Sequence, residues 1–211
     1  MRTTYTLEQI FGTRSRVRVL RTLDSVAVPM NASQIASRTG LSQPAVSATL
    51  GELADMGLVK SASAGRANVH WLVRDNVYVE QLVKSAFRFE SDLPDMLEAY
   101  VRAMFESVAE SVVLFGSYAR GDQDSSSDVD VVVVVGDARD KQRLEAGLLE
   151  STEEFAARWG APLSVIIYDT TEAADLSRRA PAFYESLVED GLRVTGPFPF
   201  EWKGAWGSDT Q

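Results

Sequence analysis

Five consecutive valines, Val131–Val135, constrain the fold of this chain more than any other stretch. A short run of β-branched residues is typical of a strand that is buried on both faces of a sheet. Two aspartates, Asp128 and Asp130, stand immediately before the run in the sequence SSSDVDVVVVV. Because a carboxylate at the mouth of such a strand is costly to bury without a partner, the pair needs an explanation.

The spacing of the two aspartates favours a metal site. Side chains alternate along a strand, so Asp128 and Asp130 fall on one face, about 7 Å apart by the standard rise. Two such carboxylates can converge on one hard cation, and Mg²⁺ prefers one or two carboxylates with water and substrate phosphates. A structural role is the alternative: Asp128 could cap the preceding loop, and Asp130 could lie at a sheet edge.

A Gly-Ser turn precedes the aspartates. The apolar segment Ser111–Phe115 predicts a strand that ends at Gly116 and Ser117, and a helical turn with Arg120 follows. Glycine lets a phosphate approach the backbone, Ser117 offers a hydroxyl, and Arg120 supplies a planar cation. Gly-Ser turns are common in loops, so the motif gains its weight from the aspartates that follow it.

The combined motif GSYARGDQDSSSDVDVVVV resembles the signature of the DNA polymerase beta-like nucleotidyltransferase superfamily, particularly its minimal nucleotidyltransferase branch. The resemblance covers residues 95–196 and implies a mixed β-sheet flanked by helices. It also implies transfer of a nucleotidyl group from a nucleoside triphosphate, expected to be ATP, to an acceptor hydroxyl with release of pyrophosphate. The implied site residues are Gly116, Ser117 and Arg120 for the nucleotide, and Asp128 and Asp130 as catalytic ligands of Mg²⁺.

The third carboxylate of active superfamily members has no clear counterpart here. That residue lies on the next strand, completes the catalytic metal site and helps to activate the attacking hydroxyl. In APLSVIIYD the matching position holds Ser164, and Asp169, five residues further on, points to the opposite face. Glu153 and Glu154 on the preceding helix could compensate, although a solvated helical face explains them more simply. The sequence therefore favours nucleotide binding and leaves catalysis open.

The first third of the chain carries a different pattern. Apolar residues at helical spacing in RSRVRVLRTLD predict one helix, Asn31 or Ser33 is the candidate cap of a second, and Gly40 ends it. A third helix is predicted to begin at the N-cap Ser42, with Pro44 in its first turn. Two strand-like segments around SAGRA follow, which completes the order of a winged helix-turn-helix.

This part, residues 5–75, resembles the winged-helix transcription regulators of the MarR-like and ArsR-like type. In those regulators the second helix of the pair enters the major groove of double-stranded DNA. Gln43 could hydrogen-bond an adenine edge, and Arg66 would reach the DNA backbone or minor groove from the wing. A dimerisation or protein-docking module is the alternative, because the helix is poor in Lys and Arg. The DNA-facing candidates are Ser42, Gln43, Ala45, Ser47, Thr49 and Arg66.

Charge supports two units with different partners. Residues 1–80 contain nine Lys or Arg against six Asp or Glu, whereas the remaining residues contain twelve against twenty-four. An acidic surface repels nucleic acid, so any DNA contact is predicted in the front part. The lone histidine, His70, is interpreted as a structural side chain. The absence of cysteine excludes disulfides and thiolate metal sites.

The expected architecture is an α+β chain with an N-terminal winged helix-turn-helix and a nucleotidyltransferase-like mixed β-sheet flanked by helices. The apolar helices between the two parts could complete the core of the C-terminal domain or form part of the interface of an expected homodimer. An apolar signal core is absent from MRTTYTLEQIFG, and no apolar run approaches membrane-spanning length, so a cytoplasmic protein with no membrane partner is expected. The predicted divisions are a DNA-binding domain (1–75), a helical connector (76–94), a nucleotidyltransferase domain (95–196) and a tail (197–211).

Three functions are compatible with these patterns. The chain could be an enzyme that transfers a nucleotidyl group to a small molecule, a protein side chain or an RNA end. It could be a DNA-bound regulator that senses a nucleotide without turning it over. It could also be a toxin–antitoxin-type component that modifies a partner while its winged helix controls transcription. Ser164 favours the sensor, whereas the intact Gly-Ser and Asp-x-Asp motifs favour the other two.

Overall fold

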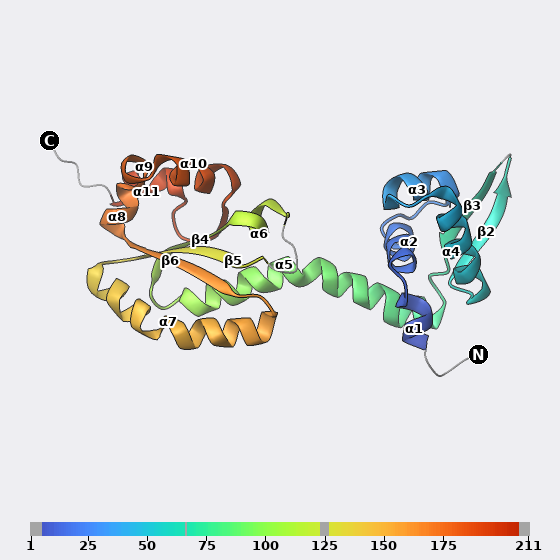
Figure 1. Cartoon of the computed structure of the whole chain (residues 1–211), viewed down its shortest axis with the longest axis horizontal. Coiled ribbons are helices and arrows are strands. Elements are labelled where there is room, and N and C mark those ends of the chain that lie inside the picture. The colour runs from blue at the N-terminus through green and yellow to red at the C-terminus, as the bar shows by residue number, and fades with distance from the viewer. Residues whose placement is uncertain (1–5, 66, 123–126, 207–211) are drawn as a thin grey trace. The chain divides into compact units, whose positions relative to one another are not determined.

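The structure, a computed structural model, describes residues 6–65, 67–122 and 127–206. The chain divides into two compact units, with the boundary between Leu93 and Pro94. Figure 1 shows the elements of each unit, and the α+β fold class predicted from the sequence is confirmed. Among the helices of the described residues, none combines the length and apolar character required to cross a lipid bilayer.

Four helices form the body of the N-terminal unit: α1 (Thr6–Phe11), α2 (Arg14–Asp24), α3 (Ala32–Thr39) and α4 (Gln43–Asp55). Asn31 caps α3 in a reciprocal capping box with Gln34, which decides between the two cap candidates of the sequence. Ser42 caps α4 as predicted, with Pro44 in its first turn. The inward side of α4 is apolar, since three of its residues are buried: Val46, Leu50 and Leu53.

A three-stranded sheet completes this unit. Its strands are β1 (Met30–Asn31), β2 (Val59–Ala64) and β3 (Ala67–Leu72), in the spatial order β1-β3-β2 with antiparallel pairing throughout. The β2–β3 hairpin is the wing that follows α4, so the order helix, helix, hairpin of a winged helix-turn-helix is present (Figure 1).

One continuous helix, α5 (Lys84–Phe105), follows a π-helical turn at Val79–Val83. Proline commonly stands in the first turn of a helix, but Pro94 lies inside α5. Proline in a helix interior removes one backbone hydrogen bond and costs about 3 kcal/mol. Burial of apolar side chains on both sides of Pro94 offsets that cost. Before Pro94, Phe87 packs against the core of the N-terminal unit. After it, three residues of α5 are buried in a core of the C-terminal unit: Leu97, Val101 and Phe105.

The C-terminal unit is built on a four-stranded mixed sheet. Its strands are β4 (Ala109–Phe115), β5 (Val129–Val135), β6 (Leu163–Asp169) and β7 (Leu192–Thr195), in the order β6-β5-β4-β7. The β5–β6 pair is parallel, whereas β4 pairs antiparallel with β5 and β7. The central strand β5 contains the five valines, which are all fully buried, as the sequence predicted.

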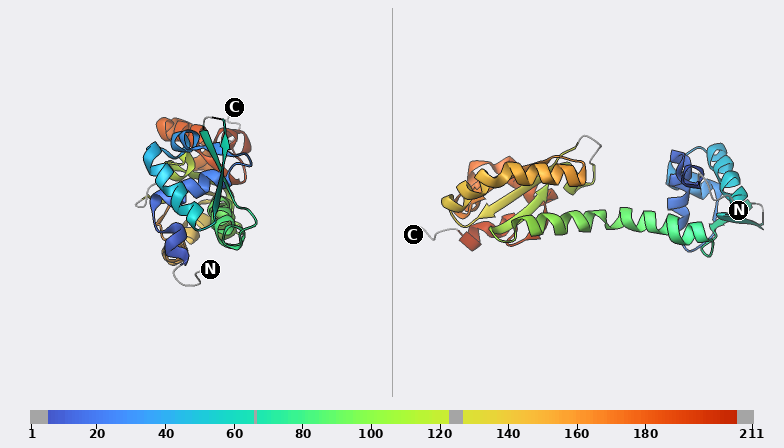
Figure 2. Two further views of the ribbon diagram at one scale, coloured as in Figure 1. Left: turned by 90° about the vertical axis from the view of Figure 1, so that its right-hand side faces the viewer. Right: turned by 90° about the horizontal axis from the view of Figure 1, so that it is seen from below.

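Helices cover both faces of this sheet (Figures 1 and 2). On one face, α5 and α7 (Ala138–Trp159) pack against Val131, Val133 and Val135. On the other face, Val132 and Val134 contact a layer made of short helices. That layer consists of α8 (Thr170–Ala174), α9 (Leu176–Arg179), α10 (Pro181–Asp190) and α11 (Pro199–Trp206). The alternation along β5 therefore separates two hydrophobic cores.

The last described element, α11, belongs to the second of these cores. This helix lies within the tail predicted from the sequence (197–211), and Trp202 docks it against the sheet. Trp202 is fully buried, and its indole N–H donates to the carbonyl of Pro197 at 2.8 Å. Satisfaction of the indole N–H allows so large a side chain to be buried at the end of the chain.

Candidate functional site

Asp128 and Asp130 stand at the beginning of the central strand β5. Asp128 directly precedes the strand and is exposed, whereas Asp130 is its second residue and is half-buried. In the sheet, Asp130 lies opposite Phe115 of β4 and beside Ser164 of β6. Asp130 therefore stands at the beginning of a central strand, between the end of β4 and the start of β6.

Gly116 lies directly against Asp130. It begins the short helix α6 (Gly116–Arg120) with a φ of +73°, and a Cβ atom built on it would stand 2.3 Å from Asp130 Oδ2. The missing side chain therefore leaves the space that the aspartate carboxylate occupies. The Gly-Ser turn and the aspartate pair, which are separated in the sequence, meet at this point.

The electrostatic surroundings of Asp130 act in two directions. Burial raises the pKa of the Asp130 carboxyl, and the nearby carboxylate of Asp128 raises it further. A hydrogen bond from the Ser164 hydroxyl and the charge of Arg120 oppose this rise. The electrostatic effect of Asp128 on Asp130 shows that the two carboxylates are near enough for their charges to interact.

The oxygen ligands available here suit a hard divalent cation whose remaining coordination positions are filled by water and a substrate. Within residues 6–65, 67–122 and 127–206, no group of three or more Asp, Glu, His or Cys side chains is arranged to hold a metal. Two carboxylates with the hydroxyl of Ser164 beside them leave most of the coordination sphere open. Mg²⁺ takes such sites, because it retains water and binds substrate phosphates as its remaining ligands.

Ser117 and Arg120, the other nucleotide candidates, both lie on α6. Ser117 is half-buried, immediately after the contact between Gly116 and Asp130. Arg120 is exposed and pairs with two carboxylates, at 3.2 Å from Asp122 and 3.9 Å from Asp190. Exposed ion pairs of this kind are weak, so a phosphate could displace these partners at little cost.

The three candidate replacements for a third carboxylate do not join the pair. The carboxylate of Asp169 caps α8 and accepts from the backbone N–H of Glu172 at 2.8 Å. Glu153 and Glu154 are exposed on α7, which covers the sheet face opposite to the one that Asp130 shares with Val132 and Val134. The third position of the site is therefore occupied by Ser164.

We expect Gly116→Ala to destabilise the chain more than Gly121→Ala does. Both glycines have a φ near +70°, but among the described residues only Gly116 has a neighbour that the new methyl group would meet, since none of them lies within 4 Å of a Cβ at Gly121. The left-handed conformation alone costs an alanine roughly 1–2 kcal/mol. Gly116→Ala must in addition displace the Asp130 carboxylate. Urea unfolding of both variants measures the difference, and equal losses would contradict the close approach.

The DNA-facing candidates separate into exposed, buried and undescribed residues. Ser42, Gln43 and Ser47 are exposed and Ala45 is half-exposed, all on or next to α4. Thr49 is buried, and its hydroxyl donates to the carbonyl of Ala45 at 2.8 Å, so it does not reach the surface that the others form. The Thr49 hydroxyl thus forms a hydrogen bond within its own helix, as threonine hydroxyls commonly do. Arg66 lies outside the described residues.

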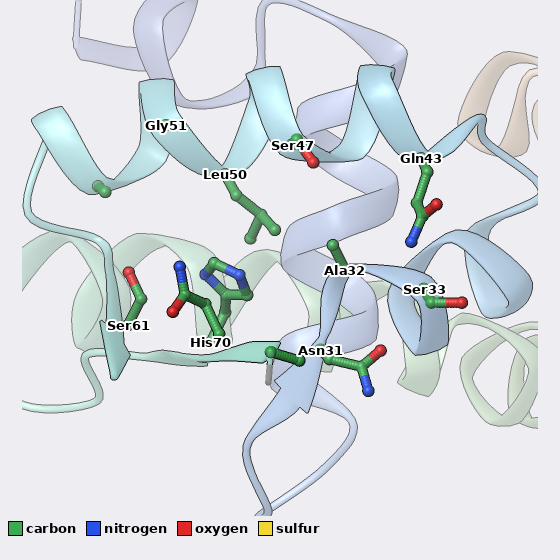
Figure 3. A pocket seen from close by; sticks show the side chains of 12 residues that line it. Asn31, Ala32, Ser33, Gln43, Ser47, Leu50, Gly51, Ser61 and His70 are labelled. Atoms are coloured by element: carbon green, nitrogen blue, oxygen red, sulfur yellow. The ribbon is translucent and has the colours of Figure 1, made fainter. Parts of the chain in front are cut away.

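A groove beside α4 includes a residue to which sequence reasoning gave no role. Gln43 and Ser47 extend from α4 toward the sheet, and His70 of β3 points back toward α4 (Figure 3). His70 pairs with Met30 on one side and Ser61 on the other, so it lies in the middle of the sheet. The two-residue period of strands, which places His70 and Asn68 on one face, was the available signal.

Comparisons with protein families agree with both units. Residues 95–191 match the family model described as a nucleotidyltransferase domain, and residues 13–67 match a model of the MarR family. A putative protein adenylyltransferase of Methanocaldococcus jannaschii is 32% identical over 74 residues. The matched segment covers 34% of this chain and 71% of that relative.

Two solved structures are similar to parts of this chain. The AntR antimony-specific transcriptional repressor has 20% identity and a TM-score of 0.37, over 43% of this chain and 78% of the repressor. A toxin–antitoxin structure with AMP-PNP has 19% identity and a TM-score of 0.34, over 52% of this chain and 86% of that chain.

Proposed function

The chain belongs to the nucleotidyltransferase family and carries a MarR-type DNA-binding domain ahead of its nucleotidyltransferase domain, and from this premise we propose a nucleotide-responsive transcription regulator. Its N-terminal unit binds double-stranded DNA through the exposed residues of α4. Its C-terminal unit binds a nucleoside triphosphate, ATP in the first instance, together with Mg²⁺.

The contact between Gly116 and Asp130 carries the nucleotide proposal. The glycine leaves room for the carboxylate, and Ser117 directly follows it in the same turn. A triphosphate bound along this turn would have its oxygens beside Asp128 and Asp130. Direct repulsion between phosphates and carboxylates then requires a cation between them.

Each residue of the site has its own role in binding the nucleotide and the cation. Asp128 and Asp130 hold the cation, which supplies charge neutralisation at the phosphates when it is bound. Gly116 allows close approach of a phosphate to the backbone, and Ser117 donates a hydrogen bond. Arg120 exchanges its carboxylate partners for a phosphate oxygen, and its planar guanidinium suits that geometry.

Two binding experiments on the full chain test the proposal. Calorimetric titration with each nucleoside triphosphate, with and without Mg²⁺, measures whether the C-terminal unit binds and which base it prefers. Selection from a randomised duplex library, followed by fluorescence anisotropy, measures whether the N-terminal unit binds DNA. Failure of either titration at millimolar ligand or micromolar duplex would remove the corresponding half of the proposal.

Nucleotidyl transfer is the second candidate function, because the Gly-Ser turn and both aspartates are retained. In this reaction an acceptor hydroxyl attacks the α-phosphorus, a new P–O bond forms, and the bond to pyrophosphate breaks. The relative's name gives a protein as its substrate. We therefore propose a hydroxyl on a protein as the acceptor here. The position beside Asp130 decides the rate, because Ser164 is a weak ligand and a weak base compared with a carboxylate.

We expect Ser164→Asp to increase nucleotidyl transfer by at least about 100-fold, the lower range of a general-base contribution. The new carboxylate would stand in register with Asp130 and could accept the proton of the attacking hydroxyl. Incorporation of label from α-³²P-labelled nucleoside triphosphate into total protein of a cell extract measures the rate.

Ser164→Asn is the matched control, since it has nearly the same shape as Ser164→Asp without its charge. We expect this control to transfer no faster than the wild type. Equal rates for the wild type and Ser164→Asp would show that the missing carboxylate is not what limits the reaction.

A further inference from the structure

A polar groove of about 480 Å³ lies in the N-terminal unit, between α4 and the β1-β3-β2 sheet (Figure 3). Gln43 and Ser47 line it from α4, and Asn68 and His70 line it from β3. Asn31 and Ser33 line it from the beginning of α3. Amide, hydroxyl and imidazole groups that can donate hydrogen bonds therefore form part of the wall, and small or apolar residues such as Leu50 and Ala54 form the rest.

The lining of this groove differs from the rest of the chain in its charge. The chain has 30 Asp and Glu residues, but among the described residues that line the groove none is acidic, and none is Lys or Arg. The acidic residues Glu52 and Asp55 of α4 line a separate pocket together with Arg16. Lys60 of β2 lines another pocket, with Trp71. A negatively charged ligand would meet no carboxylate in the groove.

We propose that this groove binds the sugar-phosphate backbone of double-stranded DNA, and that His70 contacts a phosphate oxygen there. The inference rests on the proposed DNA-binding function and adds His70 as a residue that contacts the DNA. Gln43 and Ser47 face the groove, so DNA that meets these residues of α4 passes along it. Ser, Asn and Gln side chains commonly contact phosphates in protein–DNA complexes.

His70 makes this contact sensitive to protons. Burial lowers the pKa of the His70 imidazole, so in the free protein the ring is neutral at neutral pH. No described residue that lines the groove from α3, α4, β1, β2 or β3 carries a charge that would oppose protonation. A phosphate beside the ring favours its charged form and raises the pKa of His70 in the complex.

The sign of the pH dependence follows from these two states. DNA binding takes up a proton when the pKa of His70 is higher in the complex than in the free protein. DNA affinity therefore rises as the pH falls through the pKa of the complex, and levels off below the pKa of the free protein. A rise of one pKa unit on binding corresponds to about tenfold tighter binding at low pH.

Fluorescence anisotropy with a labelled duplex, selected by the wild-type chain from a randomised library, tests the proton linkage. We expect the wild type to bind about fivefold more tightly at pH 5.5 than at pH 8, because the tenfold limit is reached only well below the pKa of the free protein. His70→Gln keeps a polar side chain without a titrating ring, and its affinity should change at least threefold less over the same range. An unchanged pH profile in His70→Gln would overturn the role of His70.

A second pair of variants tests the groove without relying on titration. Asn68→Asp places a carboxylate in the groove, and we expect it to weaken binding of the same duplex at least tenfold at pH 7.5. Ser85→Asp makes the same change of charge at an exposed position of α5 that does not line the groove. We expect this control to bind within threefold of the wild type, and circular dichroism melting verifies that both variants fold.

The outcomes distinguish this inference from the function on which it rests. If the wild type binds the duplex, but Asn68→Asp binds as tightly as Ser85→Asp, the backbone does not lie in the groove and DNA binding itself stands. If the wild type selects no duplex at any pH, the DNA-binding function and the groove assignment are both wrong.

Discussion

The double substitution Asp128→Ala/Asp130→Ala should abolish Mg²⁺-dependent binding of nucleoside triphosphates. These two side chains supply both carboxylates of the site, and no third carboxylate of the described residues stands beside them. Loss of even supporting residues around a bound metal commonly costs 10- to 100-fold in affinity, so loss of both carboxylates should cost at least about 100-fold. Calorimetric titration of the full chain with MgATP measures the change.

The control for this substitution is Glu153→Ala/Glu154→Ala. It removes the same two negative charges, but from exposed positions of α7, on the other side of the sheet. We expect its nucleotide affinity to stay within about twofold of the wild type, because exposed distant charges are screened by salt. Comparable losses in the two double variants would mean that net charge, rather than a local site, controls binding.

The substitution Trp202→Ala should lower the free energy of unfolding of the C-terminal unit by about 3–5 kcal/mol, which is the range for removal of a buried aromatic side chain. Trp202 is fully buried and packs in the same cluster as Val113 and Val132 of the two central strands. Its replacement leaves a cavity under β4 and β5 and removes the donor to the Pro197 carbonyl. Differential scanning calorimetry of the full chain measures the loss.

Trp206→Ala is the matched control for the same helix. Trp206 is only half-buried, and its ring centroid lies 6.2 Å from that of Trp202. We expect a loss of roughly 1 kcal/mol, because a partly exposed side chain leaves a smaller cavity. If Trp202→Ala were no more damaging than Trp206→Ala, α11 would not be a part of the core.

The regular elements of this fold were predictable where local pattern and tertiary packing agree. The five valines predicted a strand buried on both faces, and Ser42 and Asn31 predicted the beginnings of two helices. The course of the chain through Pro94 was not predictable. Local chemistry favours a helix boundary at a proline, and only the burial of apolar residues on both sides of it keeps α5 continuous.

The candidate site was predictable in its parts but not in its contacts. The motif predicts that Gly116 and Asp130 belong to one site, and the register of two strands then places Ser164 beside Asp130. Whether a side chain at helical spacing faces solvent depends on the neighbouring elements, and for this reason Thr49 could not be separated from Ser47 by sequence alone. That His70 lines a groove with residues of α4 follows from the packing of the sheet against this helix, which the sequence pattern does not contain.

The contiguous division of the chain at Leu93 and Pro94 sets an order of events during synthesis. The N-terminal unit is complete in sequence before any residue of the sheet that carries the aspartates has been made. At about 5–20 residues per second, the ribosome needs roughly 6 to 23 s more to reach Trp206, the last residue of α11. The mixed sheet of the C-terminal unit is completed last. Its strand β4 pairs with β7, and the core on the α11 side of this sheet contains Trp202. A nascent chain therefore completes its winged helix before the candidate nucleotide site, and the proposed nucleotide could bind only after β7 and α11 have been made.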